Sequence, residues 1–117
     1  MSTLNLYPYY EKLVREKKKY ATIRLGDQRS KYRIGQRVNL TLGWENNNEK
    51  RLIDRVEITS VHFKRIKNIV KSDLKGESPD CLNKCAIQYV LSAIYRKIVS
   101  EEDYVTIIKW KYLKNGI

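Results

Sequence analysis

Residues 37–44 alternate between polar and apolar side chains, and this pattern constrains the fold more than any other in the chain. Val38, Leu40, Leu42 and Trp44 share one parity. Apolar residues at every second position line one face of a strand, so the segment predicts a β-strand with one buried face. Three consecutive asparagines follow, and they indicate a hairpin loop over residues 45–50.

The next strand is expected over residues 52–63, and its apolar phase changes along its length. Val56 and Ile58 fall on one parity, whereas Val61 and Phe63 fall on the other. A pattern with a period of two cannot change parity without a bulge or a bend. Strands in small closed barrels often contain such a bulge, and further strands are expected over residues 20–25 and 104–112.

Helices are predicted over residues 9–18 and from Ser78 to about Val99, with a short helix or turn over 66–75. Ser78, Pro79 and Asp80 provide a capping hydroxyl, a first-turn proline and a first-turn acid. The residues expected to be buried on the second helix are Leu82, Cys85, Ala86, Tyr89, Val90, Ala93 and Ile94, and those expected to be exposed are Lys84, Gln88, Ser92 and Arg96.

This order of elements predicts a single domain over residues 1–117. Helix, strands, helices and a closing strand indicate the α+β class. We expect a small, mostly antiparallel β-barrel flanked by helices.

The chain is strongly basic, with a formal net charge of +11. Residues 1–37 contain ten Lys and Arg against three Asp and Glu, a net +7 of that total. An apolar content of 42% excludes a disordered basic tail, because it supplies enough hydrophobic material for a core. A concentrated positive field attracts polyanions, so nucleic acid or a phosphate-bearing ligand is the expected partner.

Several classes of protein are not supported by the sequence. No segment is long and apolar enough to span a bilayer and no signal-type run follows Met1, so a cytoplasmic protein without a membrane partner is expected. Cys81 and Cys85 lie four residues apart and His62 is the single histidine, so neither a metal site nor a cofactor is expected. Both cysteines are expected to pack in the interior.

Residues 17–27 form a basic run that leads into a short strand and a Gly-Asp turn. Cations, a hydroxyl group and a guanidinium are thereby placed close together, which suits an anionic or nucleotide-like ligand. Tyrosines beside cations are candidates for stacking on unpaired bases. The residues proposed from this reasoning to bind ligand or RNA are Lys17, Lys18, Lys19, Tyr20, Thr22, Arg24, Arg29, Lys31, Tyr32 and Arg33.

The chain resembles the ASCH domain, a member of the PUA-like β-barrel superfamily. Residues 19–27 are similar to the family signature Gly-x-Lys-Thr-x-Thr-x-Arg. Three further segments match in order: Tyr32-x-x-Gly35-x-x-Val38, Asp73-x-x-Gly76-Glu77-Ser78 and the strand 105–110. Two positions depart from the signature, because Lys17 stands where glycine is usual and Tyr20 where threonine is usual.

The resemblance implies a cleft between barrel and helices, lined by the signature residues Lys19, Thr22 and Arg24. ASCH domains are viewed mainly as RNA-binding modules. One bacterial branch removes the acetyl group from acetylcytidine with a lysine, a threonine and a glutamate. By alignment of the motifs these would be Lys19, Thr22 and Glu77 in this chain.

Two functions therefore stay open. The first is binding of RNA or a modified nucleoside in a basic cleft, which the net charge favours. The alternative is an amidohydrolase that uses Lys19, Thr22 and Glu77, with lysine as a base only in its neutral form. Residues three apart in a strand face opposite ways, so Lys19 and Thr22 can meet only if the chain bends near Lys19. Nuclease action is harder to support, because no histidine or carboxylate cluster accompanies the motif.

Overall fold

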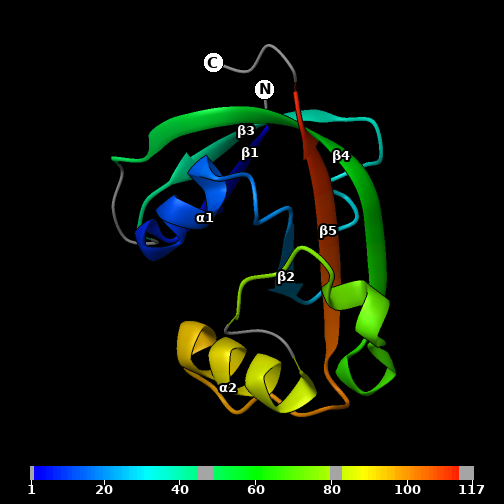
Figure 1. Ribbon diagram of the computed structural model, residues 1–117. Helices are drawn as coiled ribbons and strands as arrows, with labels where there is room; N and C mark the ends of the chain where they lie inside the picture. The colour runs from blue at the N-terminus through cyan, green and yellow to red at the C-terminus, as the bar shows by residue number, and fades with distance from the viewer. Residues whose placement is uncertain (1, 45–48, 80–82, 114–117) are drawn as a thin grey trace.

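One mixed sheet, curved into a half-barrel, forms the body of the protein (Figure 1). The computed structural model describes residues 2–44, 49–79 and 83–113. The strands are β1 Thr3–Leu6, β2 Ala21–Leu25, β3 Arg37–Leu42, β4 Arg51–Arg65 and β5 Tyr104–Tyr112. They lie in the order β1-β3-β4-β5-β2, with β1 parallel to β3 and every other pair antiparallel. The predicted α+β class and mostly antiparallel sheet are confirmed.

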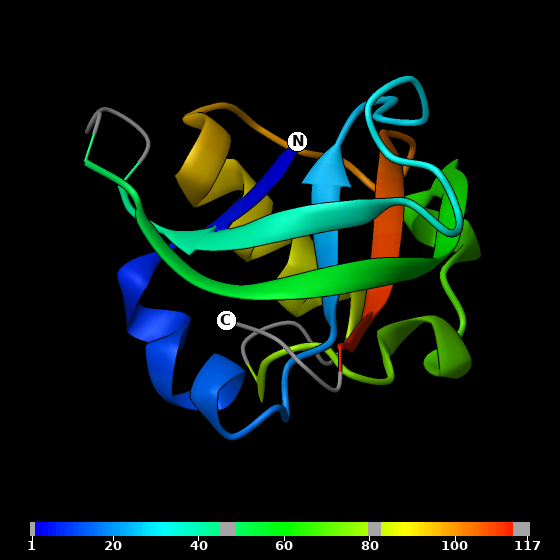
Figure 2. The same cartoon turned by 90° about the horizontal axis from the view of Figure 1, so that it is seen from above.

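Strong twist makes β3 and β4 cross over β2 and β5 when the molecule is seen from above (Figure 2). The change of apolar phase predicted in the long strand is accompanied by a register shift between Ile58 and Ser60, where β4 pairs with β5. Val56 and Ile58, before the shift, are both fully buried. A bulge at this point bends β4 and lets one strand serve two parts of the curved sheet.

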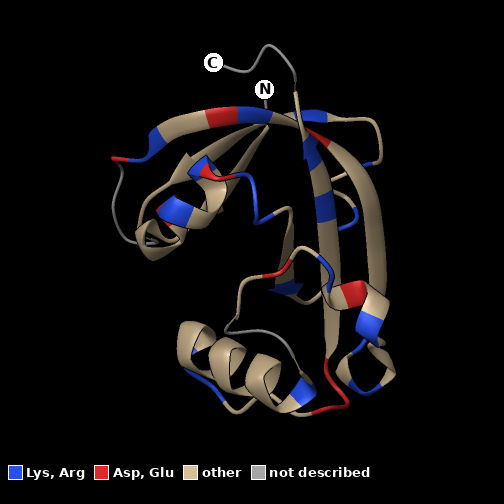
Figure 3. Ribbon diagram, viewed as in Figure 1, with Lys and Arg blue, Asp and Glu red and all other residues tan. Residues whose placement is uncertain are grey.

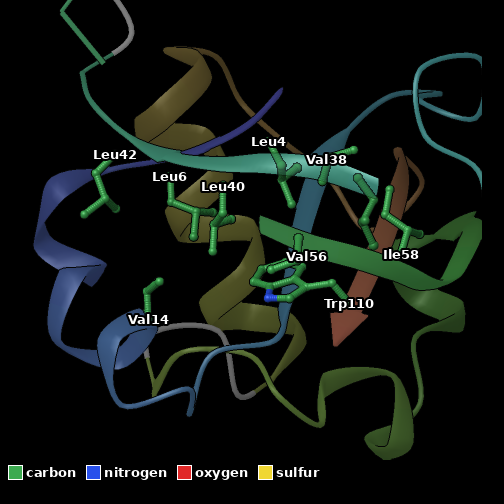
Figure 4. Packing of buried hydrophobic residues seen from close by; sticks show 10 residues of the cluster. Leu4, Leu6, Val14, Val38, Leu40, Leu42, Val56, Ile58 and Trp110 are labelled. Carbon is green, nitrogen blue, oxygen red and sulfur yellow. The ribbon is translucent and has the colours of Figure 1, made fainter. Parts of the chain in front are cut away.

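Two hydrophobic clusters form the core, and they draw on opposite faces of β5, with Ile108 and Trp110 in one and Val105 and Ile107 in the other. The first joins β1, β3, β4 and β5 to α1 (Glu11–Arg15), and Val14 is the buried residue of that helix (Figure 4). The second joins β2 and β5 to α2 (Lys84–Tyr95) and contains Ile23, Ile87, Leu91 and Val105. The site described below lies between the two clusters.

The first helix is shorter than the predicted 9–18. A 3₁₀ turn, Pro8–Tyr10, precedes α1. Helix α1 ends at Arg15, and Lys17, the residue after its C-cap Glu16, is in a left-handed conformation with φ 58°. The Lys17 N–H donates to the Val14 carbonyl (2.9 Å) and the Lys18 N–H donates to the Leu13 carbonyl (2.8 Å). These two bonds form a Schellman motif, whose left-handed position glycine usually occupies. Glycine is also the residue usual at this position of the ASCH signature.

The start predicted for the second helix is wrong, and its predicted buried face is wrong in part. Helix α2 begins at Lys84, and its N-cap is Asn83, whose side chain accepts a hydrogen bond from the Ala86 N–H (2.8 Å). Ser78 is buried elsewhere, and Asp80, Cys81 and Leu82 lie outside the described residues. The helix buries Ile87 and Leu91, whereas Cys85, Tyr89 and Ala93 are exposed. It ends at Tyr95 because Arg96 adopts a left-handed conformation.

Strand β1 was not expected from the sequence. It contains four residues and pairs in parallel with β3, so its partner lies more than thirty residues away along the chain. Antiparallel pairing of β3 with β4 agrees with the predicted hairpin, although residues 45–48 of its loop lie outside the described part of the chain.

Replacement of Lys17 by glycine should stabilise the protein, because glycine adopts the left-handed conformation without the steric cost of a Cβ atom. We expect Lys17→Gly to raise the free energy of unfolding by about 1 kcal/mol. Urea unfolding measures the change. Lys18→Gly is the matched control, since it removes the same charge without relieving strain. Equal effects of the two substitutions would contradict the assigned strain.

Candidate ligand-binding cavity

A cavity of about 390 Å³ lies between β2, α2 and the N-terminal segment. Lys19, Thr22 and Arg24 line it from the β2 side, and Glu77 lines it from the loop before α2. Its volume falls within the range typical of small-ligand sites, about 300–1,000 Å³. The remaining lining residues are Asn5, Leu6, Tyr7, Tyr10, Ile23, Lys31, Lys50, Ile87, Val90, Leu91, Ile94 and Tyr95.

Lys19 is buried, with only 2% of its surface exposed. Its Nζ donates to the Ala21 carbonyl (2.8 Å), to Ser78 Oγ (2.9 Å) and to Glu77 Oε1. An ammonium group has three protons, so these three acceptors use all of them. The same Nζ lies 4.6 Å from the centre of the Tyr10 ring, which adds a cation–π contact. Lys19 is therefore held as a charged ammonium on the cavity wall.

Glu77 supplies the opposite charge, and its side chain is 3% exposed. Its Oε1 also accepts from the Ser78 N–H (2.8 Å) and the Ser78 hydroxyl (3.0 Å). Helix α2 begins only at Lys84, so its N-terminus does not stabilise this carboxylate. The Lys19 ammonium and the Ser78 donors stabilise the charge of Glu77 instead.

Glu77 reaches Lys19 because the residue before it is glycine. The Gly76 carbonyl accepts from the Tyr20 N–H (2.9 Å) and the Ala21 N–H (3.1 Å), which joins the loop to the start of β2. Gly76 has φ +92°, and a Cβ atom there would lie 2.4 Å from Cε2 of the Tyr20 ring. Only glycine permits this contact without displacement of the ring.

Tyr112 fixes the backbone of Lys19. Its hydroxyl donates to the Lys19 carbonyl (2.5 Å). Burial raises the pKa of Tyr112 to about 12, because desolvation disfavours the phenolate. The phenol therefore stays protonated, and keeps its donor, throughout the neutral range.

Lys19 and Thr22 line the same cavity although they are three residues apart. Strand β2 begins only at Ala21, and the chain turns at Lys17, so Lys19 does not follow the alternation of the strand. The bend that the motif required is present. Thr22 is 7% exposed and lies on β2 two residues before Arg24.

Arg24 bridges the two edges of the half-barrel, β1 and β2. Its Nη2 donates to the Asn5 carbonyl on β1. Asn5 is itself fixed, since it accepts from Thr41 Oγ1 (2.9 Å) and donates to the Gly43 carbonyl (2.9 Å). Arg24 Nε is buried and has no hydrogen-bond partner among the described residues. Arg24 therefore combines a structural bond with a donor that is unused within the described chain.

Six residues proposed from the sequence to bind ligand do not line this cavity. Lys17 lies 5.8 Å from the Tyr112 ring centre, and Lys18 pairs with Glu16 (3.3 Å). The ring of Tyr20 packs against Gly76, and Arg29 pairs with Asp27. The Tyr32 hydroxyl donates to the Thr3 carbonyl, and Arg33 is exposed. Lys31 is the residue of the 29–33 group that reaches the cavity.

Other lining residues were missed in the sequence. Asn5, Lys50 and Tyr95 come from three segments that meet only in the folded chain. No local pattern marks them. The apolar wall from α2 was only partly anticipated, because the predicted buried face of that helix included Val90 and Ile94 but not Ile87 and Leu91.

Within residues 2–44, 49–79 and 83–113, no group of three or more His, Cys, Asp or Glu side chains is placed to hold a metal ion. The helices in that part of the chain are all too short or too polar to cross a membrane.

Loss of one partner from the buried ion pair should be costly, because the other charge is then left without compensation. We expect Glu77→Gln, like Lys19→Met, to lower the free energy of unfolding by about 3–5 kcal/mol. The double variant should recover a large part of that loss. Urea unfolding of all four proteins gives the coupling energy.

The exposed Lys18–Glu16 pair provides the control, because its removal by Lys18→Met should cost less than about 1 kcal/mol. Additive effects of Lys19→Met and Glu77→Gln would contradict a buried ion pair.

Comparison with known proteins defines the fold. No protein-family model and no curated protein sequence matches the chain. Solved structures do: an ASCH domain from Lactobacillus crispatus has a TM-score of 0.67 at 15% identity, over 95% of this chain and 79% of that one. A DUF984 protein from Enterococcus faecalis has a TM-score of 0.61 at 13% identity, over 90% and 70%. A hypothetical protein has a TM-score of 0.55 at 16% identity, over 95% and 97%. The chain therefore has the fold of an ASCH domain.

Proposed function

We propose that the protein binds an unpaired nucleotide of RNA, or a modified nucleoside, with the base in the cavity. The observation that carries this proposal is Arg24, a residue of the cavity lining whose buried Nε has no partner among the described residues. Buried donors are nearly always hydrogen-bonded in proteins. A ligand acceptor, such as a carbonyl oxygen or ring nitrogen of a base, would complete this set.

The lining of the cavity suits a flat ring with polar edges. One wall is apolar, with Ile23 from β2 and Ile87 and Leu91 from α2, and the rings of Tyr10 and Tyr95 add aromatic surface. The polar groups are concentrated at Lys19, Thr22, Arg24 and Glu77. An unpaired base is recognised by contact with its faces and hydrogen bonds to its edge.

Two lysines of the cavity lining could bind the phosphate of a nucleotide. Lys31 and Lys50 are exposed residues of this lining. Lys and Arg also occur along β5, on β2 and in the loop after α1 (Figure 3). Such charges strengthen RNA binding at low salt, with a slope of about −0.7 per neutralised phosphate for single strands.

A direct test is the binding of nucleoside 5′-monophosphates and short RNA to wild type and Arg24→Lys. Lysine keeps the charge but loses the Nε donor and the planar fork. We expect Arg24→Lys to weaken binding of both ligand types by roughly 10- to 100-fold, the value of a hydrogen bond from a charged donor. Isothermal titration measures the affinities.

The matched control for this test is Arg33→Lys, because Arg33 is exposed and lies outside the cavity. It should leave binding of the monophosphates unchanged. If Arg24→Lys binds both ligands as well as wild type does, the cavity is not the binding site.

A second function, amide hydrolysis of an acylated nucleoside such as acetylcytidine, is favoured by one observation. Lys19, Thr22 and Glu77 line the same cavity. Thr22 would attack the acetyl carbonyl, the freed amine would leave with a proton, and water would release acetate from the threonine ester. Lys19 is held as an ammonium, so it acts as a base only after transfer of a proton to Glu77.

The hydrolase function is tested by release of cytidine from acetylcytidine. If it operates, Thr22→Val should abolish turnover while nucleoside binding persists, since valine preserves the shape of the side chain and removes the nucleophile. Circular dichroism checks that the variant is folded. Turnover by Thr22→Val at the wild-type rate would exclude Thr22 as nucleophile, and absence of turnover in wild type would leave binding as the function.

A further inference from the structure

We propose that an aromatic groove beside the cavity stacks the bases next to the bound nucleotide, so that the ligand is single-stranded RNA. This inference rests on the proposed function. The groove has a volume of about 530 Å³ and is lined by Tyr7, Tyr9, Trp44, Tyr95 and Arg96, together with Ala93 and Ile94.

Three rings of the groove form one cluster. The ring centres of Tyr7 and Trp44 are 5.3 Å apart, those of Tyr7 and Tyr9 are 5.8 Å apart, and those of Tyr9 and Trp44 are 6.0 Å apart. Trp44 is nevertheless 51% exposed and Tyr9 is 56% exposed. Grouped exposed aromatic rings are unusual on a protein surface and indicate a contact site.

The groove continues from the cavity. Tyr7, Ile94 and Tyr95 line both, so the two spaces share a wall formed by the N-terminal segment and the C-terminal end of α2. Figure 2 shows that end of α2 on the same side of the molecule as the end of β3, which Trp44 follows. A strand with one nucleotide in the cavity would therefore place its next bases over the groove.

Charge selects a nucleic acid over an apolar partner. Arg96 lines the groove, and Lys31 and Lys50 line the adjoining cavity. None of the three forms an ion pair with another residue of the described chain. The side chain of Lys50 packs against Gly43, and a Cβ atom at position 43 would lie 2.6 Å from Lys50 Cγ. Rings for bases and cations for phosphates are the two components of single-strand binding sites.

The strand must be unpaired. A base within a duplex is already stacked and paired, so its faces cannot reach protein rings, whereas single-stranded bases can splay out onto them. Tyr7 and Trp44 are inclined by 34° and Tyr7 and Tyr9 by 50°, so the rings offer several facets rather than one flat platform. Facets of this kind suit successive bases with little preference for sequence.

The test compares a fluorescein-labelled octaribonucleotide of random sequence with a mixture of the four nucleoside 5′-monophosphates. We expect Trp44→Ala and Tyr9→Ala to weaken octamer binding by roughly 5- to 150-fold, as measured by anisotropy, and to leave monophosphate binding unchanged. Tyr89→Ala is the matched control, because Tyr89 is 78% exposed and lines neither space. It should bind the octamer as wild type does.

A second measurement reports stacking itself. The chain has two tryptophans, and Trp110 is only 2% exposed, so a stacked base quenches the fluorescence of Trp44. The octamer should quench wild type and fail to quench Trp44→Phe, although that variant still binds. A duplex of the same length should quench neither.

The outcomes separate this inference from the proposed function. If Arg24→Lys weakens binding of both ligands while Trp44→Ala and Tyr9→Ala change neither, the groove is not a stacking site and the cavity still binds. Equal losses of monophosphate and octamer in Trp44→Ala would also overturn the inference, since the residue would then act on the cavity. Binding of monophosphates without binding of the octamer would overturn it while a nucleoside function stands.

Discussion

The buried ion pair between Lys19 and Glu77 is the interaction on which the site depends. Its partners are 58 residues apart, one before β2 and one in the loop before α2. Two desolvated charges contribute to stability only when their remaining hydrogen-bonding groups are also paired. Ser78, the Ala21 carbonyl and the Tyr10 ring meet that condition for Lys19. The pair thereby fixes the loop against the sheet and forms one wall of the cavity.

This arrangement separates Lys19, whose donors are all engaged within the protein, from Arg24, which keeps an unpaired donor within the described chain. The three protons of Lys19 are engaged within the protein, so its contribution is charge and position. Arg24 differs, because one of its nitrogens bonds to Asn5 while Nε stays without a partner in the described chain. Thr22 lies beside it on β2. Recognition of a base therefore needs only donors already in place, whereas hydrolysis needs a proton to move within the ion pair first.

The sequence predicted what local periodicity encodes. Alternation identified β3, the change of parity in β4 coincides with its bulge, and the motif residues Lys19, Thr22 and Arg24 line one cavity. Errors arose where distant contacts decide. Ser78 resembles a helix cap but is a partner of Lys19. The buried face predicted for the helix included Tyr89, which is exposed, and omitted Ile87, which is buried. Strand β1 and the aromatic groove depend on segments that only the sheet topology brings together.

One side chain, Arg24, spans the seam where β1 and β2 approach without forming a ladder. Binding of a ligand to Arg24 should therefore also stabilise the contact between β1 and β2. Whatever free energy a ligand gains through the guanidinium must, by reciprocity, also appear as resistance of the seam to opening. Amide hydrogen exchange at the two edges should slow on ligand binding even though neither edge acquires a new backbone partner.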